Sequence, residues 1–119
     1  EHGTGHGVGF FSNVHEGPQS LSKYNKIKIC EGMILSNEPG YYKKGKFGIR
    51  IENLVYVKKF NKKLLFENLT LAPIDTDLIN PELLTNNEKD YLSKYNSLIY
   101  SKLSKFLNTN ERKWLSSFI

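Results

Sequence analysis

Two glutamates with a turn-forming segment between them are the residues best suited to chemistry in this 119-residue chain. Glu38 and Glu52 lie on either side of Gly45, within a stretch rich in lysine and glycine. If the chain folds back at Gly45, facing residue numbers sum to about 90, so the two carboxylates face each other across a strand pair. Facing carboxylates repel, and a divalent cation relieves the repulsion by coordinating both. The spacing therefore predicts a cation site on this hairpin.

Arg50 and His6 are the other polar residues that bear on this site. Strand alternation places Arg50 on the same face as Glu52, so an ordinary surface patch of ion pairs is the competing interpretation. His6 favours the cation site, because its glycine neighbours allow the backbone to approach a bulky group closely. A histidine with two carboxylates suits manganese, iron, cobalt or zinc. Three ligands are too few for a dinuclear site, so we expect further ligands from sequence outside these residues.

Composition and the remaining motifs argue against other classes of function. The net charge is +5, but the lysines are scattered and arginine occurs only at Arg50 and Arg112, which disfavours nucleic-acid binding. No apolar run approaches the roughly 20 residues of a membrane helix. The glycines at residues 3–7 come without the lysine of a phosphate-binding loop. The single cysteine, Cys30, excludes an internal disulfide, and we expect it to be a small buried hydrophobic residue rather than a nucleophile.

The elements that must position these residues are strands first and helices last. We expect an extended glycine-rich segment over residues 1–18, and strands over 32–38, 47–60 and 64–73. Asn80-Pro81-Glu82 is typical of a helix start, and Thr85 with Glu88 forms a capping box. A short final helix over 111–118 carries Trp114. An amphipathic helix is predicted from apolar residues spaced by three and four: Tyr91, Leu92, Tyr95, Leu98, Ile99, Leu103, Phe106 and Leu107. The order indicates an α+β fold.

Four motifs in order, and with matching spacing, resemble aminopeptidase P of the pita-bread metallopeptidases, the group that includes prolidase and creatinase. They cover residues 2–9, 14–18, 32–42 and 47–53. The segment 69–74 and the terminal helices also resemble the eukaryotic type. The resemblance implies that residues 1–76 are the second half of the pita-bread catalytic domain, with a curved antiparallel sheet. Residues 77–119 would be its carboxy-terminal helical extension.

The same resemblance implies a role for each candidate residue. His6, Glu38 and Glu52 would be ligands of two divalent metal ions, usually manganese in that family, with Glu52 bridging both. Glu38 would also relay a proton. His15 would position the substrate and shuttle protons, His2 would line the pocket for proline, and Arg50 would steady the site. The family needs two further aspartates from an earlier strand pair, and Asp75, Asp77 and Asp90 do not match that motif.

The implied activity is release of the amino-terminal residue from peptides with proline in second position, by a hydroxide bridging two metals. We expect a cytoplasmic homodimer that binds neither nucleic acid nor membrane. The present residues alone, without the upstream part of the polypeptide, are expected to be inactive. Two alternatives remain: a prolidase-like dipeptidase, and a non-catalytic pita-bread module that binds proteins. The segment after Pro73 favours the aminopeptidase, and the presence of His6, Glu38 and Glu52 disfavours the binding module.

Overall fold

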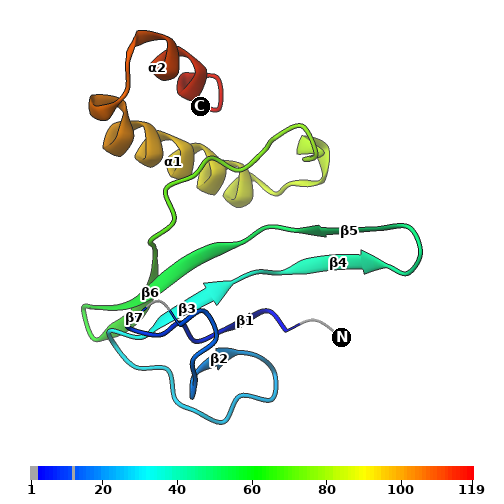
Figure 1. Ribbon diagram of the computed structural model, residues 1–119, viewed down its shortest axis with the longest axis vertical. Coiled ribbons are helices and arrows are strands. Elements are labelled where there is room, and N and C mark those ends of the chain that lie inside the picture. The colour runs from blue at the N-terminus through cyan, green and yellow to red at the C-terminus, as the bar shows by residue number, and fades with distance from the viewer. Residues whose placement is uncertain (1–2, 12) are drawn as a thin grey trace. The chain divides into compact units, whose positions relative to one another are not determined.

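The computed structural model describes residues 3–11 and 13–119. A long hairpin that turns at Gly45 runs through its first part (Figure 1). Leu35 lies opposite Val55, and Tyr41 lies opposite Ile49. Both pairs sum to 90, so the predicted register is confirmed. The hairpin's strands are β3 (Ile34–Asn37), β4 (Gly40–Lys43), β5 (Phe47–Arg50) and β6 (Asn53–Phe60). The predicted strand 47–60 is divided into β5 and β6, and the predicted strand 32–38 ends at Asn37 and is followed by β4, which was not predicted. Each arm is therefore interrupted, and the interruptions contain Glu38 and Glu52.

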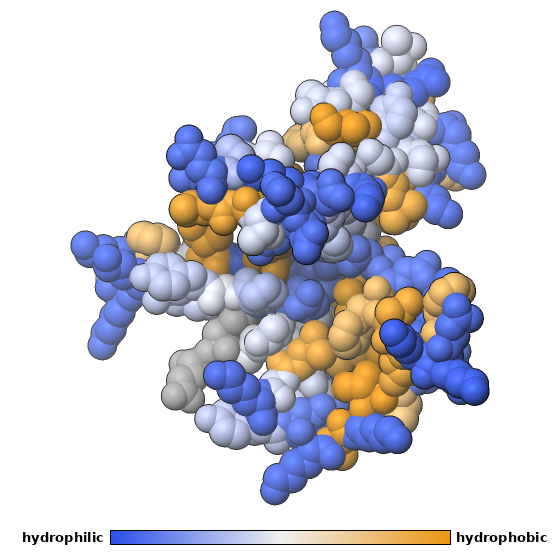
Figure 2. Space-filling view, turned by 180° about the vertical axis from the view of Figure 1, so that it is seen from behind, coloured by the Kyte–Doolittle hydropathy of each residue, from blue (hydrophilic) through white to orange (hydrophobic). Residues whose placement is uncertain are grey.

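The third predicted strand is β7 (Lys63–Asn68), which pairs antiparallel with β6. Asn61 and Lys62 form the turn with φ values of 47° and 65°, the positive values that match a tight hairpin to strand twist. The strand ends earlier than the predicted residue 73. Leu35, Val55 and Val57 form the buried core of this sheet. The three apolar side chains of β7, Leu64, Leu65 and Phe66, remain exposed. Exposed hydrophobic residues form the orange patches on the surface in Figure 2.

The glycine-rich segment forms β1 (Gly5–His6), paired with β2 (Ser20–Leu21). A bridge between Gly7 and Leu35 joins this pair to β3 in antiparallel register. A side chain at Gly5 would collide with the backbone, because its Cβ would lie 1.9 Å from the carbonyl oxygen of Ser36. Glycine at this position therefore lets β1 approach β3 closely, as the sequence predicted for a closely packed backbone.

Cys30 is exposed, so its predicted burial is wrong. The residue is not on a strand: the amide of Met33 donates to its carbonyl at 3.3 Å, and Gly32 has a φ of +85°. The turn that these residues make brings Cys30 to the surface before β3 begins, because φ > 0 is available to glycine and ends the extended conformation.

The helical part of the chain forms a second compact unit, and the division falls between Thr70 and Leu71. Its helices are a 3₁₀ turn (Pro81–Leu83), α1 (Asn86–Leu103), a second 3₁₀ turn (Ser104–Phe106) and α2 (Thr109–Ser116). The predicted capping box of Thr85 and Glu88 is present at the start of α1. A second one, of Asn108 and Glu111, starts α2 two residues before the predicted position. The strands-then-helices order is the predicted α+β arrangement.

The core of this unit consists of Tyr95 and Ile99 of α1 with Leu115 of α2. The Tyr95 hydroxyl donates to the carbonyl of Ala72 at 2.9 Å, which ties α1 to the segment that precedes the helices. Not all of the predicted apolar face is buried. Tyr91 and Phe106 are 48% and 75% exposed, because α2 covers only the part of α1 that Tyr95 and Ile99 occupy.

Candidate active site

Glu38 is the most buried of the predicted site residues that the structure describes, with 6% of its surface exposed. Its backbone amide donates to the carbonyl of Thr4 at 2.7 Å. One carboxylate oxygen, Oε1, accepts a hydrogen bond from the hydroxyl of Ser36 at 2.8 Å. The other, Oε2, lies 3.3 Å from Nη1 of Arg50. A buried charge needs such partners, so the surrounding residues hold this carboxylate in one orientation.

His6 lies beside this carboxylate, with Nε2 at 3.0 Å from Oε1 of Glu38. Nδ1 is 2.9 Å from the carbonyl oxygen of Gly7. A carbonyl can only accept, so Nδ1 carries a proton, and in the neutral ring Nε2 presents its lone pair to Glu38. Two lone-pair atoms this close need a cation between them, either a proton, as in an ion pair, or a metal ion. Two ligand atoms at right angles on one cation, each about 2.1 Å from it, lie about 3.0 Å apart. The pair therefore fits a shared metal ion.

Arg50 connects Glu38 to Glu52. Its Nε lies 3.5 Å from Oε2 of Glu52, while its Nη1 faces Glu38. The side chains of Arg50 and Glu52 are about half exposed, at 46% and 45%. The guanidinium thus supplies positive charge to both carboxylates. Within residues 3–11 and 13–119, no group of three or more His, Cys, Asp or Glu side chains is gathered closely enough to hold a metal ion.

His15 also reaches the site, although it comes from a different segment. Its ring centroid lies 4.3 Å from that of His6, and the two planes are tilted by 39°. His15 is exposed, so it is accessible to a substrate from solvent while it contacts a predicted metal ligand. His2, the other predicted substrate residue, lies outside the described residues. The structure therefore brings His6, Glu38, Arg50 and His15 together and connects Glu52 to them through Arg50.

Ser36 belongs to this site and is not among the predicted residues. It is completely buried, its hydroxyl donates to Glu38, and it accepts the backbone amide of His6 at 2.9 Å. A signal was present in the sequence, because residues two apart on a strand lie on the same face, and Ser36 precedes Glu38 by two.

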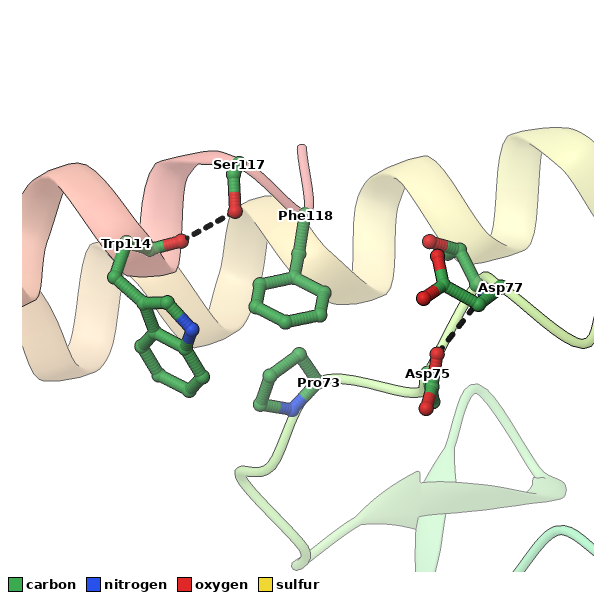
Figure 3. A pocket seen from close by; sticks show the side chains of 7 residues that line it. Pro73, Asp75, Asp77, Trp114, Ser117 and Phe118 are labelled. Carbon is green, nitrogen blue, oxygen red and sulfur yellow. Dashed lines mark hydrogen bonds between the residues drawn. The ribbon is translucent and has the colours of Figure 1, made fainter.

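Apart from the residues around Glu38, a cavity with a volume of about 510 Å³ lies within the helical unit. Figure 3 shows the rings of Trp114 and Phe118 on one side and Asp75 and Asp77 on another. The rings meet edge to face with centroids 5.2 Å apart. One carboxylate oxygen of Asp75 accepts the amide of Asp77 at 2.9 Å and so helps to fix the loop. The lining includes neither histidine nor cysteine, and none of the predicted site residues lies there.

Two family descriptions together match nearly the whole chain. Residues 1–59 match metallopeptidase family M24, and residues 62–117 match the C-terminal region of peptidase M24. The chain belongs to metallopeptidase family M24. This M24 chain is 47% identical, over 127 aligned residues, to a probable Xaa-Pro aminopeptidase P of Coprinopsis cinerea. It is 46% identical, over the same length, to a probable Xaa-Pro aminopeptidase P of Ajellomyces capsulatus.

These alignments cover 96% of the M24 chain but only 20% and 21% of the two relatives. The chain thus spans about a fifth of the length of the curated relatives that it matches. A solved structure is also similar: the X-prolyl aminopeptidase of Caenorhabditis elegans, described as a cytosolic enzyme with a di-nuclear active site. Its TM-score is 0.86 at 38% identity, over 98% of this chain and 21% of that one.

The comparisons confirm the resemblance to aminopeptidase P and the α+β pita-bread fold that the sequence implied. Residues 62–117, which include both α-helices, match the C-terminal region of peptidase M24. Among the described residues of the M24 chain, no helix is both long enough and apolar enough to cross a membrane.

Proposed function

We propose that this chain supplies part of the active site of a metallo-aminopeptidase that removes the amino-terminal residue from peptides with proline in second position. The observation that carries the proposal is the pairing of His6 Nε2 with Glu38 Oε1 at 3.0 Å, with Nδ1 engaged by a carbonyl. This arrangement fits two ligands of one cation. The names of the three similar proteins described above, two probable Xaa-Pro aminopeptidases P and one X-prolyl aminopeptidase, support the choice of substrate.

The metal would be held by His6, Glu38 and Glu52, together with two aspartates from another part of the polypeptide. We propose two divalent ions, in keeping with the di-nuclear site of the C. elegans enzyme, and manganese as their identity. Nitrogen and carboxylate oxygen are ligands that suit this ion. Divalent cations in such a site supply Lewis acidity, polarising a carbonyl and lowering the pKa of water toward neutrality.

The other residues act on the substrate and on protons. Glu38, whose carboxylate is oriented by three neighbours, accepts a proton from the attacking water and passes it to the leaving nitrogen. His15, exposed beside His6, binds the peptide and assists that transfer, while His2 contacts the proline ring. Arg50 steadies both carboxylates. An X-Pro bond lacks an N–H group, so its recognition depends on shape and on contacts to the carbonyl.

We further propose that the polypeptide acts as a homodimer in the cytoplasm. The C. elegans enzyme's description as cytosolic supports the location. Its partners in the reaction are peptides with an amino-terminal X-Pro sequence. The family match over residues 62–117 favours an aminopeptidase over a prolidase-like dipeptidase or a non-catalytic module, because the named relatives share this region.

The test uses the complete polypeptide that contains this chain. It should hydrolyse a tripeptide with proline in second position, ignore the same peptide with alanine there, and lose activity after chelation. Glu52→Gln should abolish turnover and lower the manganese content. Glu67→Gln is the matched control, because Glu67 also pairs with a cation, Lys58 at 2.8 Å, but on the β6–β7 hairpin. A Glu52→Gln protein with normal metal content and turnover would contradict the proposal.

A further inference from the structure

We infer that Ser36 is a positioning residue for the metal ligands: its buried hydroxyl holds the Glu38 carboxylate and the backbone of His6 in one arrangement. This inference rests on the proposed function, because it concerns the same site. It assigns a role to a residue that touches neither the substrate nor the metal.

The hydrogen bonds of Ser36 have a direction that the chemistry determines. The backbone amide of His6 can only donate, so Oγ of Ser36 accepts its hydrogen bond, at 2.9 Å. The hydroxyl proton is then available for Oε1 of Glu38, 2.8 Å away. Hydroxyl donors to carboxylates form strong, charge-assisted bonds. One side chain thereby connects the main chain of one proposed ligand to the side chain of the other.

The packing around Ser36 keeps water away from its hydrogen bonds. The side chain is fully buried on β3, and water does not reach it to replace a missing hydrogen bond. The amide of Glu38 donates to Thr4, and the amide of Val8 donates to Ile34; in that register His6 lies opposite Ser36. The close approach that Gly5 permits, with its Cβ position 1.9 Å from the Ser36 carbonyl oxygen, brings the His6 amide within reach of Oγ.

Removal of the hydroxyl should therefore loosen the metal site while leaving every ligand in place. Oε1 of Glu38 would keep His6 as a neighbour, but the donor that orients the carboxylate toward Nε2 would be gone. Partners that orient metal ligands typically contribute about 10- to 100-fold in metal affinity. We expect a loss of that size from Ser36→Ala.

The experiment measures manganese binding by calorimetric titration in the complete polypeptide, for the wild type and three variants. Ser36→Ala should bind about 10- to 100-fold more weakly. Ser36→Thr keeps the hydroxyl and should restore the affinity. Thr70→Val is the matched control: Thr70 Oγ1 also accepts a backbone amide, from Leu54 at 2.8 Å, and that hydrogen bond involves none of the proposed ligands, so binding should be unchanged.

A spectroscopic measurement separates positioning from general loss of structure. Cobalt(II) substituted for manganese reports the ligand arrangement by its visible absorption, which should change in Ser36→Ala and stay the same in Thr70→Val. Wild-type affinity and spectrum in Ser36→Ala would overturn the inference, and so would equal weakening in Ser36→Ala and Thr70→Val. Those results would leave the proposed function intact. A wild type that binds no manganese would overturn the proposed function, and this inference with it.

Discussion

Glu38 and Glu52 are both proposed metal ligands but have very different surroundings, so their glutamine variants should differ in stability. The Glu38 side chain is 8% exposed and has His6, Ser36 and Arg50 as partners. Removing one member of a buried pair costs about 3–5 kcal/mol. Arg50 is half exposed and keeps Glu52 as a partner, so solvent screening reduces the cost. We expect about 1–3 kcal/mol for Glu38→Gln and about 0–1 kcal/mol for Glu52→Gln.

The assay is hydrogen exchange followed by mass spectrometry on the complete polypeptide, in the presence of a chelator so that metal binding does not contribute. Exchange reports the free energy of local opening, and 1.4 kcal/mol corresponds to a factor of ten. In peptides that cover β3 and β5, Glu38→Gln should raise exchange about 5- to 150-fold, and Glu52→Gln about 5-fold or less. Equal effects of the two variants, or a larger effect of Glu52→Gln, would refute the reasoning from burial.

Three further predictions concern other parts of the chain. His15→Ala should lower turnover on X-Pro peptides by about 10²-fold or more with manganese content unchanged; a variant that loses metal would instead make His15 a ligand. Ile99→Ala, at a fully buried position, should destabilise the helical unit by about 2–5 kcal/mol in hydrogen exchange, and the partly exposed Leu98→Ala by less. Hydrogen bonds from Thr85 lower the pKa of Glu88 below its ordinary value of 4.5. These hydrogen bonds stabilise α1 above pH 4.5, and the stabilisation is lost as the pH falls through the lowered pKa. Circular dichroism measured against pH should show this loss in the wild type and not in Glu88→Ala.

The parts of the fold that the sequence predicted well depend on local signals. The hairpin register follows from the turn at Gly45 and from strand alternation, and it is confirmed residue by residue. The capping box of Thr85 and Glu88 needs only residues three apart and is present as predicted. The overlooked box of Asn108 and Glu111 has the same spacing, so the start of α2 was readable from the sequence with the same rule.

The features that the sequence did not reveal depend on contacts between distant segments. The spacing of Tyr91 and Phe106 indicates an apolar helix face, but α2 determines which part of it is covered, and both side chains remain exposed. Alternation places Ser36 on the face of Glu38, but its hydrogen bond to the amide of His6 exists only because β1 lies beside β3. Arg50 was expected on the face of the glutamates, yet its position between them depends on side-chain torsions that alternation does not specify.

The two edges of the chain segment that carries Glu38 explain how these distant segments meet. Along an extended strand, successive backbone groups form hydrogen bonds to opposite sides. On one side, toward the other hairpin arm, Pro39 has no amide proton to donate, and its carbonyl accepts the amide of Ile51 at 3.3 Å. On the other side, the amide of Glu38 donates to the carbonyl of Thr4 at 2.7 Å, and the carbonyl of Ile34 accepts the amide of Val8 at 3.2 Å. These bonds hold the glycine-rich segment beside β3, and His6, two residues after Thr4, thereby reaches the Glu38 carboxylate.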